Sequence, residues 1–219
     1  MNSHSPSIKI VTLGGGTGLS TLLKGLKDTS HLCGARQNAK SNETPHKISL
    51  TAIVTVTDDG KSSGRLREEF GILPPGDIRN CLVALADEND LVTRLFRYRF
   101  PGEHALGGHS LGNLVLTALT QMHDDNFLVA IDEARKLLGI EARVLPSTLD
   151  HVDLIADFNG KQVRGQIAIK SQFGKIQRLS LTPHDAKALP ETVEAILDAD
   201  LITLGPGSLF TSVIPNLLV

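Results

Sequence analysis

A loop rich in polar side chains follows an apolar stretch in the first third of the sequence. It runs from Thr57 to Arg65 (TDDGKSSGR) and carries carboxylate, hydroxyl, lysine and arginine side chains. Carboxylates in such a loop can hold Mg²⁺, bind ribose hydroxyls or accept a substrate proton, although the same residue types also form solvated turns. The loop follows a predicted strand, Ile48–Val56, and open α/β sheets bind ligands at the carboxyl ends of strands. We therefore predict binding contacts from Asp58, Asp59, Ser62 and Ser63.

Two glycine-rich loops could bind anions. One is Gly14–Gly18 (GGGTG), after the apolar stretch Ile8–Leu13, and the other is Gly205–Ser208 (GPGS), after Asp200–Leu204. Glycine lets the backbone approach a phosphate closely, and free amides at a helix N-terminus hold the anion; the alternative is a tight turn that simply needs glycine. The Rossmann fingerprint G-x-G-x-x-G fails, because Leu19 stands at its third glycine. The candidate contacts are Gly14, Gly15, Gly16, Thr17, Gly18, Gly205, Gly207 and Ser208.

A third segment, Pro74–Asn80 (PPGDIRN), turns into a predicted helix. Asp77 is well placed to cap the N-terminus of that helix, where free amides need acceptors. Arg79 and Asn80 fall in the first turn, where their side chains could face a ligand or solvent. We retain Asn80 as a candidate contact to a sugar or ribose.

The segment Gly108–Gly112 (GHSLG) matches the G-x-S-x-G pattern of serine hydrolases. That pattern needs a strand immediately before the serine, and the proline and glycines of Phe100–Gly107 argue against one. We predict instead that Ser110 caps the next helix and that His109 and Asn113 lie near a ligand. Isolated histidines are more often structural, which is the alternative for His109.

Apolar stretches and helical patterns alternate between these loops, which is typical of an α/β fold. Leucines at 19, 22, 23 and 26 mark one helical face. From about residue 143 the apolar residues tend to alternate, and Asn159-Gly160 is a strong hairpin signal. The predicted strands are 8–13, 48–56, 152–158, 161–170, 176–181 and 200–204, and the further predicted helices are 78–85, 111–118, 127–138 and 193–197.

This order predicts a doubly wound, mostly parallel Rossmann-like sheet with a small antiparallel β insertion, a meander, near residues 143–182. We expect a single α/β nucleotide-binding domain over residues 8–219, with an exposed polar insertion at 28–47. The chain closes on an apolar tail, Asn216–Val219, directly after a loop. We therefore expect a truncation at the C-terminus.

Composition places the chain among cytoplasmic globular proteins. Its 219 residues are 41% hydrophobic, and 22 basic against 24 acidic residues give a net charge of −2. Without a basic excess, no nucleic acid or anionic membrane is expected as a partner. No apolar run approaches the roughly 18 residues of a membrane span, no signal peptide opens the chain, and its two cysteines form neither a disulfide framework nor a metal pair.

Together these segments resemble the CofD/YvcK family, most closely its YvcK-like branch of gluconeogenesis factors. The resemblance rests on Gly14–Ser20, Thr57–Arg67, Leu73–Ala86, Gly108–Leu114, Arg143–Pro146 and Leu204–Val219. For that branch it implies UDP-N-acetylglucosamine or a related UDP-sugar as ligand, and a role in cell shape and wall synthesis on gluconeogenic carbon sources. It attaches no reaction to the branch, so the leading hypothesis is a binding regulator with a protein partner rather than an enzyme; a homo-oligomer stays open.

The related branch supplies the alternative. It consists of 2-phospho-L-lactate transferases of coenzyme F420 synthesis, which transfer a phospholactyl group from a guanosine diphosphate carrier to a deazaflavin alcohol and use Mg²⁺. Under this alternative Asp58 and Asp59 are the metal ligands. Under the leading hypothesis the two glycine loops hold a diphosphate, while Asp58, Asp59 and Asn80 hold sugar or ribose groups.

The sequence departs from the family pattern in three places. Lys61 stands where the family loop usually has glycine; a positive φ there would strain the backbone, whereas a negative φ would leave the lysine available to a phosphate. The segment 31–46 is longer than the corresponding segment in the family usually is. Family members also normally continue beyond the last residues of this chain, so we expect one wall of the site to be missing.

Overall fold

The main sheet of the computed structural model, which describes residues 7–35 and 47–219, is parallel. Its strands are β1 (Ser7–Gly14), β2 (Lys47–Val54), β3 (Arg143–Pro146) and β7 (Leu201–Leu204), in the order β3-β2-β1-β7. The chain thus moves outward from β1 through β2 to β3 and later returns to the other side of β1. This reversal of direction beside β1 confirms the predicted doubly wound fold.

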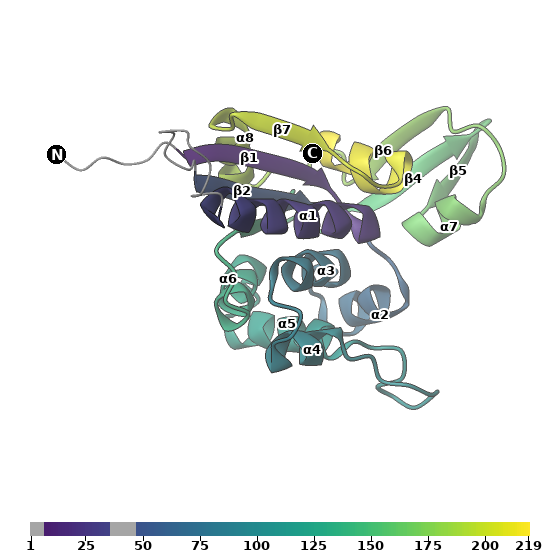
Figure 1. Cartoon of the computed structure of the whole chain (residues 1–219). Helices are drawn as coiled ribbons and strands as arrows, with labels where there is room; N and C mark the ends of the chain where they lie inside the picture. Colours follow the sequence, from purple (N-terminus) through teal and green to yellow (C-terminus); the bar gives the residue numbers. More distant parts are fainter. Residues whose placement is uncertain (1–6, 36–46) are drawn as a thin grey trace.

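Helices cover both faces of this sheet. One face carries α1 (Gly16–Ala35), α3 (Gly76–Leu85) and α6 (Phe127–Leu137), and α8 (Pro190–Leu197) packs on the other. A further layer beyond α3 consists of α2 (Lys61–Phe70), α4 (Leu91–Arg97) and α5 (Leu111–Met122) (Figure 1). Because both faces are covered, β1 can bury Ile10 on one side and Val11 on the other, which explains why its buried half does not alternate between apolar and polar residues.

A small antiparallel sheet lies beside the carboxyl end of the main sheet (Figure 1). Its strands are β4 (Asp153–Phe158), β5 (Lys161–Arg164) and β6 (Arg178–Thr182), in the order β5-β4-β6. Asn159 and Gly160 join β4 to β5 with positive φ angles of 57° and 84°, as the hairpin signal predicts. The antiparallel insertion is therefore confirmed.

Two details of the predicted insertion are wrong. Arg143–Pro146 belongs to the main sheet, where it pairs in parallel with β2. The strand predicted over 161–170 ends at Arg164, because Gly165 takes a φ of +95° and the chain turns into helix α7 (Gln166–Ser171). Short apolar segments do not distinguish strand from helix by pattern alone, and here tertiary contacts decide.

Three other predictions can be compared with the structure. The polar insertion predicted at 28–47 falls largely outside the described residues, although helix α1 continues as far as Ala35. Lys61 opens helix α2 and has no positive φ, so a side chain causes no backbone strain there. None of the helices in the described part of the chain is long and apolar enough to cross a membrane.

Candidate functional site

The predicted loops meet at the carboxyl edge of the sheet, where the strand order reverses beside β1. The Thr55 amide donates to the Gly14 carbonyl at 2.9 Å, and the Gly205 amide donates to the Leu13 carbonyl at 2.8 Å. These bonds hold the segments after β1, β2 and β7 against one another. In open α/β sheets this switch point is where ligands bind.

The glycine loop after β1 is packed closely against protein atoms. A Cβ on Gly15 would lie 2.6 Å from Thr55 Cγ2 and 2.9 Å from Asp77 Oδ2, and a Cβ on Gly18 would collide with the backbone of Pro206 and Gly207. Gly16 needs its glycine for another reason, since its φ is +63°. The close approach that Gly15 and Gly18 permit is therefore made by the protein itself.

A buried carboxyl group from helix α3 occupies this loop. Asp77 is 8% exposed, and the Gly16 amide hydrogen-bonds its carboxyl group. Burial, followed by the nearby charge of Asp58, raises the pKa of Asp77 to about 7. The prediction that Asp77 caps its helix is wrong: α3 begins at Gly76 after Pro75, and no side chain caps it, because the Asp77 carboxyl reaches across to the glycine loop.

The two neighbouring aspartates of the acidic loop serve different elements. Asp58 Oδ1 accepts a hydrogen bond from the Gly60 amide at 3.0 Å, and its Oδ2 lies against Gly76 at the start of α3. Asp59 Oδ1 instead accepts from the Ile167 amide in the first turn of α7 at 3.0 Å. The charge of Asp58 therefore acts on Asp77, whereas Asp59 is directed toward the antiparallel insertion.

Removing the Asp59 carboxylate should loosen α7. A charged acceptor on a free helix amide contributes about 1–2 kcal/mol, so Asp59→Ala should lower the free energy of unfolding by that amount and raise amide hydrogen exchange over residues 166–171. Asp157→Ala, which removes a carboxylate from the turn after β4, is the control and should leave exchange in α7 unchanged. Equal protection of α7 in Asp59→Ala and the native protein would contradict this role.

A chain of hydrogen bonds links helices α2, α3 and α5 below the glycine loop. Arg79 Nε donates to Asn113 Oδ1 at 2.9 Å, and Asn113 Nδ2 donates to Ser62 Oγ at 2.9 Å. Ser62 Oγ lies 3.0 Å from His109 Nδ1. Burial, then the charge of Arg65, lowers the pKa of His109, so its ring is neutral at pH 7. Nδ1 can therefore accept a hydrogen bond from the Ser62 hydroxyl.

The family follows from comparison with known proteins. A family model described as 2-phospho-L-lactate transferase CofD matches residues 10–219. The chain belongs to the CofD family. The gluconeogenesis factor of Bacillus subtilis is 48% identical over 213 residues, which are 96% of this chain and 61% of that protein. The gluconeogenesis factor of Halalkalibacterium halodurans is 47% identical over 96% of this chain and 60% of its own length.

A solved structure supports the same placement. A crystal structure of a Bacillus halodurans protein matches with a TM-score of 0.85 and 46% identity, covering 97% of this chain and 63% of the other. This CofD-family chain therefore spans less than two thirds of the length of these relatives. Its fold is that of the solved relative, and the relatives carry the name of gluconeogenesis factors.

Among the remaining predicted contacts of the CofD-family chain, two are hydrogen-bonded within the protein and two are exposed. Ser63 Oγ accepts from the Gly76 amide at 3.1 Å and so fixes the start of α3, while Asn80 Oδ1 accepts from Arg79 Nη2 at 2.6 Å. Thr17 and Ser208 are exposed at the two glycine loops. Ser110 is fully buried and accepts from the Asn113 amide at 3.3 Å, which confirms it as the cap of α5 rather than a hydrolase nucleophile.

Gln166 is a residue of the candidate site that sequence reasoning missed. Its Nε2 donates to Thr57 Oγ1 at 2.7 Å and to the Thr211 carbonyl at 2.8 Å. It thereby ties the segment after β2 to the π-helical turn η1 (Leu209–Val213) that follows β7. A single polar residue in a strand-like pattern carries no signal for such a long-range contact.

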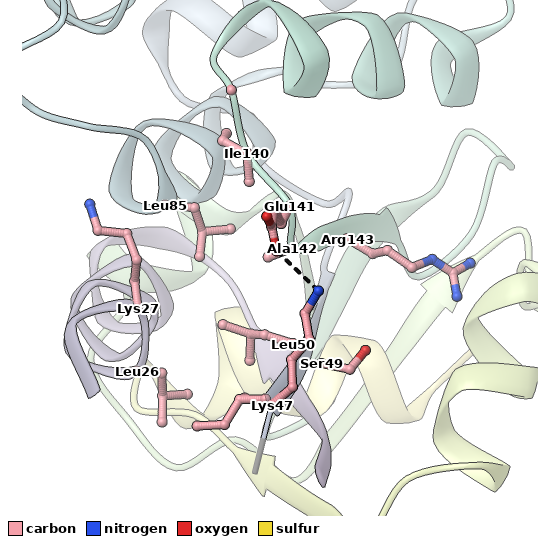
Figure 2. Close-up of a pocket in the computed structure, with 12 residues that line it drawn as sticks. Leu26, Lys27, Lys47, Ser49, Leu50, Leu85, Ile140, Glu141, Ala142 and Arg143 are labelled. Atoms are coloured by element: carbon pink, nitrogen blue, oxygen red, sulfur yellow. Dashed lines mark ion pairs between the residues drawn. The ribbon is translucent and has the colours of Figure 1, made fainter. Parts of the chain in front are cut away.

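A separate cavity of about 400 Å³ lies at the opposite, amino-terminal end of β2 and β3 (Figure 2). Apolar side chains such as Leu50 and Ile140 line it, and the Lys47–Glu141 ion pair, 3.6 Å long, crosses it. It contains none of the residues predicted from the loops. The convergence of buried polar groups at the carboxyl edge makes that edge the stronger candidate site.

Proposed function

We propose that this chain is the nucleotide-sugar-binding part of a cytoplasmic regulator related to the gluconeogenesis factors, with UDP-N-acetylglucosamine or a similar UDP-sugar as ligand. The observation that carries the proposal is the convergence of polar groups at the switch point. Asp77 and Arg79 on α3 and His109 in the loop before α5 are all at most 8% exposed, and Asp77 lies against Gly15 at the end of β1. Buried polar groups gathered in this way cost stability and are retained for binding.

In this proposal each loop contacts a different part of the ligand. Thr17 and Ser208 are exposed on the two glycine loops that pack together, and their hydroxyl groups bind the sugar of the ligand. Asp58 and Asn80 hold hydroxyl groups of ribose or sugar. The regulatory role in cell shape and wall synthesis then requires a protein partner that senses the occupied site.

A second candidate function is a phospholactate-type transferase, which the Asp58–Asp77 pair favours. Mg²⁺ commonly takes one or two carboxylates and completes its shell with water and substrate phosphates. The mutual repulsion that raises the pKa of Asp77 fits a pair that would hold a cation, and among the described residues no larger cluster of acidic, histidine or cysteine side chains competes for it. A bound Mg²⁺ would neutralise the charge of a diphosphate leaving group.

Calorimetric titration separates the two functions. UDP-N-acetylglucosamine and GDP are each titrated, with and without Mg²⁺, into the protein in its full natural length. Tight binding of the UDP-sugar that does not depend on Mg²⁺ is the expected result, whereas a preference for GDP with Mg²⁺ would replace the regulator by the transferase. Binding of neither nucleotide would contradict both.

Two matched threonines locate the site. Thr17 and Thr21 are both exposed, one turn apart on α1, and only Thr17 lies in the glycine loop. Thr17→Val should weaken UDP-N-acetylglucosamine binding at least tenfold, because it removes a hydroxyl from the ligand side of the loop. Thr21→Val should leave the dissociation constant within a factor of two, and an equal effect of both substitutions would place the ligand elsewhere.

A further inference from the structure

Arg79 is a buried cation whose hydrogen-bond partners are both neutral. It is 8% exposed, and its guanidinium donates to the side-chain oxygens of Asn113 and Asn80. Within residues 7–35 and 47–219 no carboxylate lies within ion-pairing distance of it. The other well-shielded arginine, Arg67, does pair with a carboxylate, Asp153, at 2.8 Å.

Such an arrangement is costly unless an anion completes it. A buried charge is strongly unfavourable unless opposite charges or hydrogen bonds compensate it, and the carboxylates of Asp77 and Asp58 act on Arg79 only from beyond ion-pairing distance. The two bonds to asparagine use two of the five N–H groups of the guanidinium, so three remain for another acceptor. Burial and the charges of Arg99 and Arg97 lower the pKa of Arg79 to about 10 against the opposing charges of Asp77 and Asp58, so Arg79 stays charged at pH 7.

The glycine loop, by contrast, is poorly suited to hold a phosphate unaided. The Gly16 amide is already engaged by the Asp77 carboxyl, and Asp58 adds a second acidic group beside it. Gly15 and Gly18 are in close contact with Asp77 and with the loop after β7. An incoming phosphate would meet acidic groups at the glycine loop, whereas Arg79 would offer it a positive charge and free N–H groups.

We propose that Arg79 is the residue that binds the phosphate groups of the nucleotide ligand, in place of the amides of the glycine loop. The inference rests on the proposed function and deepens it, because it names the group that recognises the anionic part of the ligand. The chain Arg79–Asn113–Ser62–His109 holds the guanidinium in one orientation: Asn113 must present its oxygen to Arg79, since its nitrogen donates to Ser62. Neutral partners fix the direction of Arg79 and leave its charge for the ligand.

The experiment compares ligands that differ in phosphate content. UDP-N-acetylglucosamine, uridine and pyrophosphate are titrated calorimetrically into the native protein, Arg79→Gln and Arg79→Lys. Arg79→Gln should bind UDP-N-acetylglucosamine and pyrophosphate at least 100-fold more weakly while its affinity for uridine stays within a factor of two. Arg79→Lys should lose about tenfold, because lysine keeps the charge but not the two-pronged contact.

Arg97→Gln is the matched control, since it removes a neighbouring positive charge on α4 that is paired with Glu88 and half exposed. It should change each dissociation constant by less than a factor of two. Circular dichroism melting checks folding, and Arg79→Gln should melt no lower than the native protein, because its amide can still donate to Asn113 and a buried charge has been removed.

The results distinguish a wrong ligand from a wrong role for Arg79. If the native protein binds pyrophosphate through Arg79 but not UDP-N-acetylglucosamine, the proposed ligand is wrong and the role of Arg79 stands. If the native protein binds UDP-N-acetylglucosamine and Arg79→Gln binds it equally well, the role of Arg79 is wrong and the proposed function stands. A parallel loss of uridine binding in Arg79→Gln would also overturn the phosphate role, and a native protein that binds none of the probes overturns both.

Discussion

Replacing Gly18 by alanine should lower the free energy of unfolding by about 3 kcal/mol, whereas replacing Gly25 in the same helix should raise it by roughly 0.5–1 kcal/mol. A Cβ on Gly18 would collide with the backbone of Pro206 and Gly207, which cannot rotate away as a side chain could. A Cβ on Gly25 would meet nothing within 4 Å. Alanine there only reduces the flexibility of the unfolded chain and favours the helix.

Urea denaturation of the two variants and the native protein measures both effects. The Gly25 variant controls for any general consequence of adding a methyl group to α1. The Gly18 variant should also show faster hydrogen exchange in residues 205–208, since the loop after β7 has to move away. An unchanged midpoint for Gly18→Ala would mean that the two glycine loops are not in contact in solution, and the proposed joint binding of the sugar by both loops would fail with it.

Most strands of the main sheet and helix α1 could be predicted because their buried apolar residues follow regular patterns. Strands β1 and β2 are covered on both faces, so their buried halves are mostly apolar without alternation, and glycine or polar residues follow them. Helix α1 buries Leu19 and Leu23, two of the residues in its leucine pattern. The Asn159-Gly160 turn depends only on local backbone preference.

The errors arise where distant residues decide the structure. Residues 166–171 have a strand-like composition but form α7, whose free amide is capped by Asp59 and whose first residue, Gln166, is buried between two other segments. Arg143–Pro146 is too short to reveal by its pattern which sheet it joins. Neither the contacts of α7 nor the pairing of Arg143–Pro146 with β2 produces a pattern in the local spacing of residue types.

The position of the candidate loops at the carboxyl edge could be predicted from the sequence, but the contacts that their residues make could be predicted only in part. The types and positions of Gly16, Asp58 and Asn113 point to binding, and the structure brings them into neighbouring segments. That the carboxyl group in the glycine loop comes from Asp77 depends on the packing of α3 beneath α1. A sequence shows an aspartate near a helix start, and the nearest local function for it is a cap.

Replacing Asp77 by asparagine should stabilise the protein above neutral pH by up to about 4 kcal/mol and leave its stability at pH 4 nearly unchanged. The pKa of Asp77 is about 7 in the folded protein against 3.8 as the ordinary value. Between these values the folded state binds more protons than the unfolded state, so the free energy of unfolding falls as the pH rises from about 4 to 7. Asparagine cannot ionise and still offers an oxygen to the Gly16 amide.

Chemical denaturation at several pH values from 4 to 8.5 measures this directly. The native curve should fall with rising pH and the Asp77→Asn curve should be flatter, while Asp185→Asn at an exposed position keeps the native shape. Parallel curves for the native protein and Asp77→Asn would show that Asp77 is ionised at low pH and that the acidic pair is not under strain.

The same chemical denaturation, repeated with Mg²⁺, tests whether Asp58 and Asp77 bind a metal ion. A cation between Asp58 and Asp77 would relieve their repulsion, so Mg²⁺ should stabilise the native protein at pH 8 and have little effect on Asp77→Asn, which lacks one of the two charges. Equal stabilisation of both proteins would place any bound Mg²⁺ elsewhere. In that case the proton on Asp77, rather than a metal ion, is what reduces the repulsion between Asp58 and Asp77 near the glycine loop.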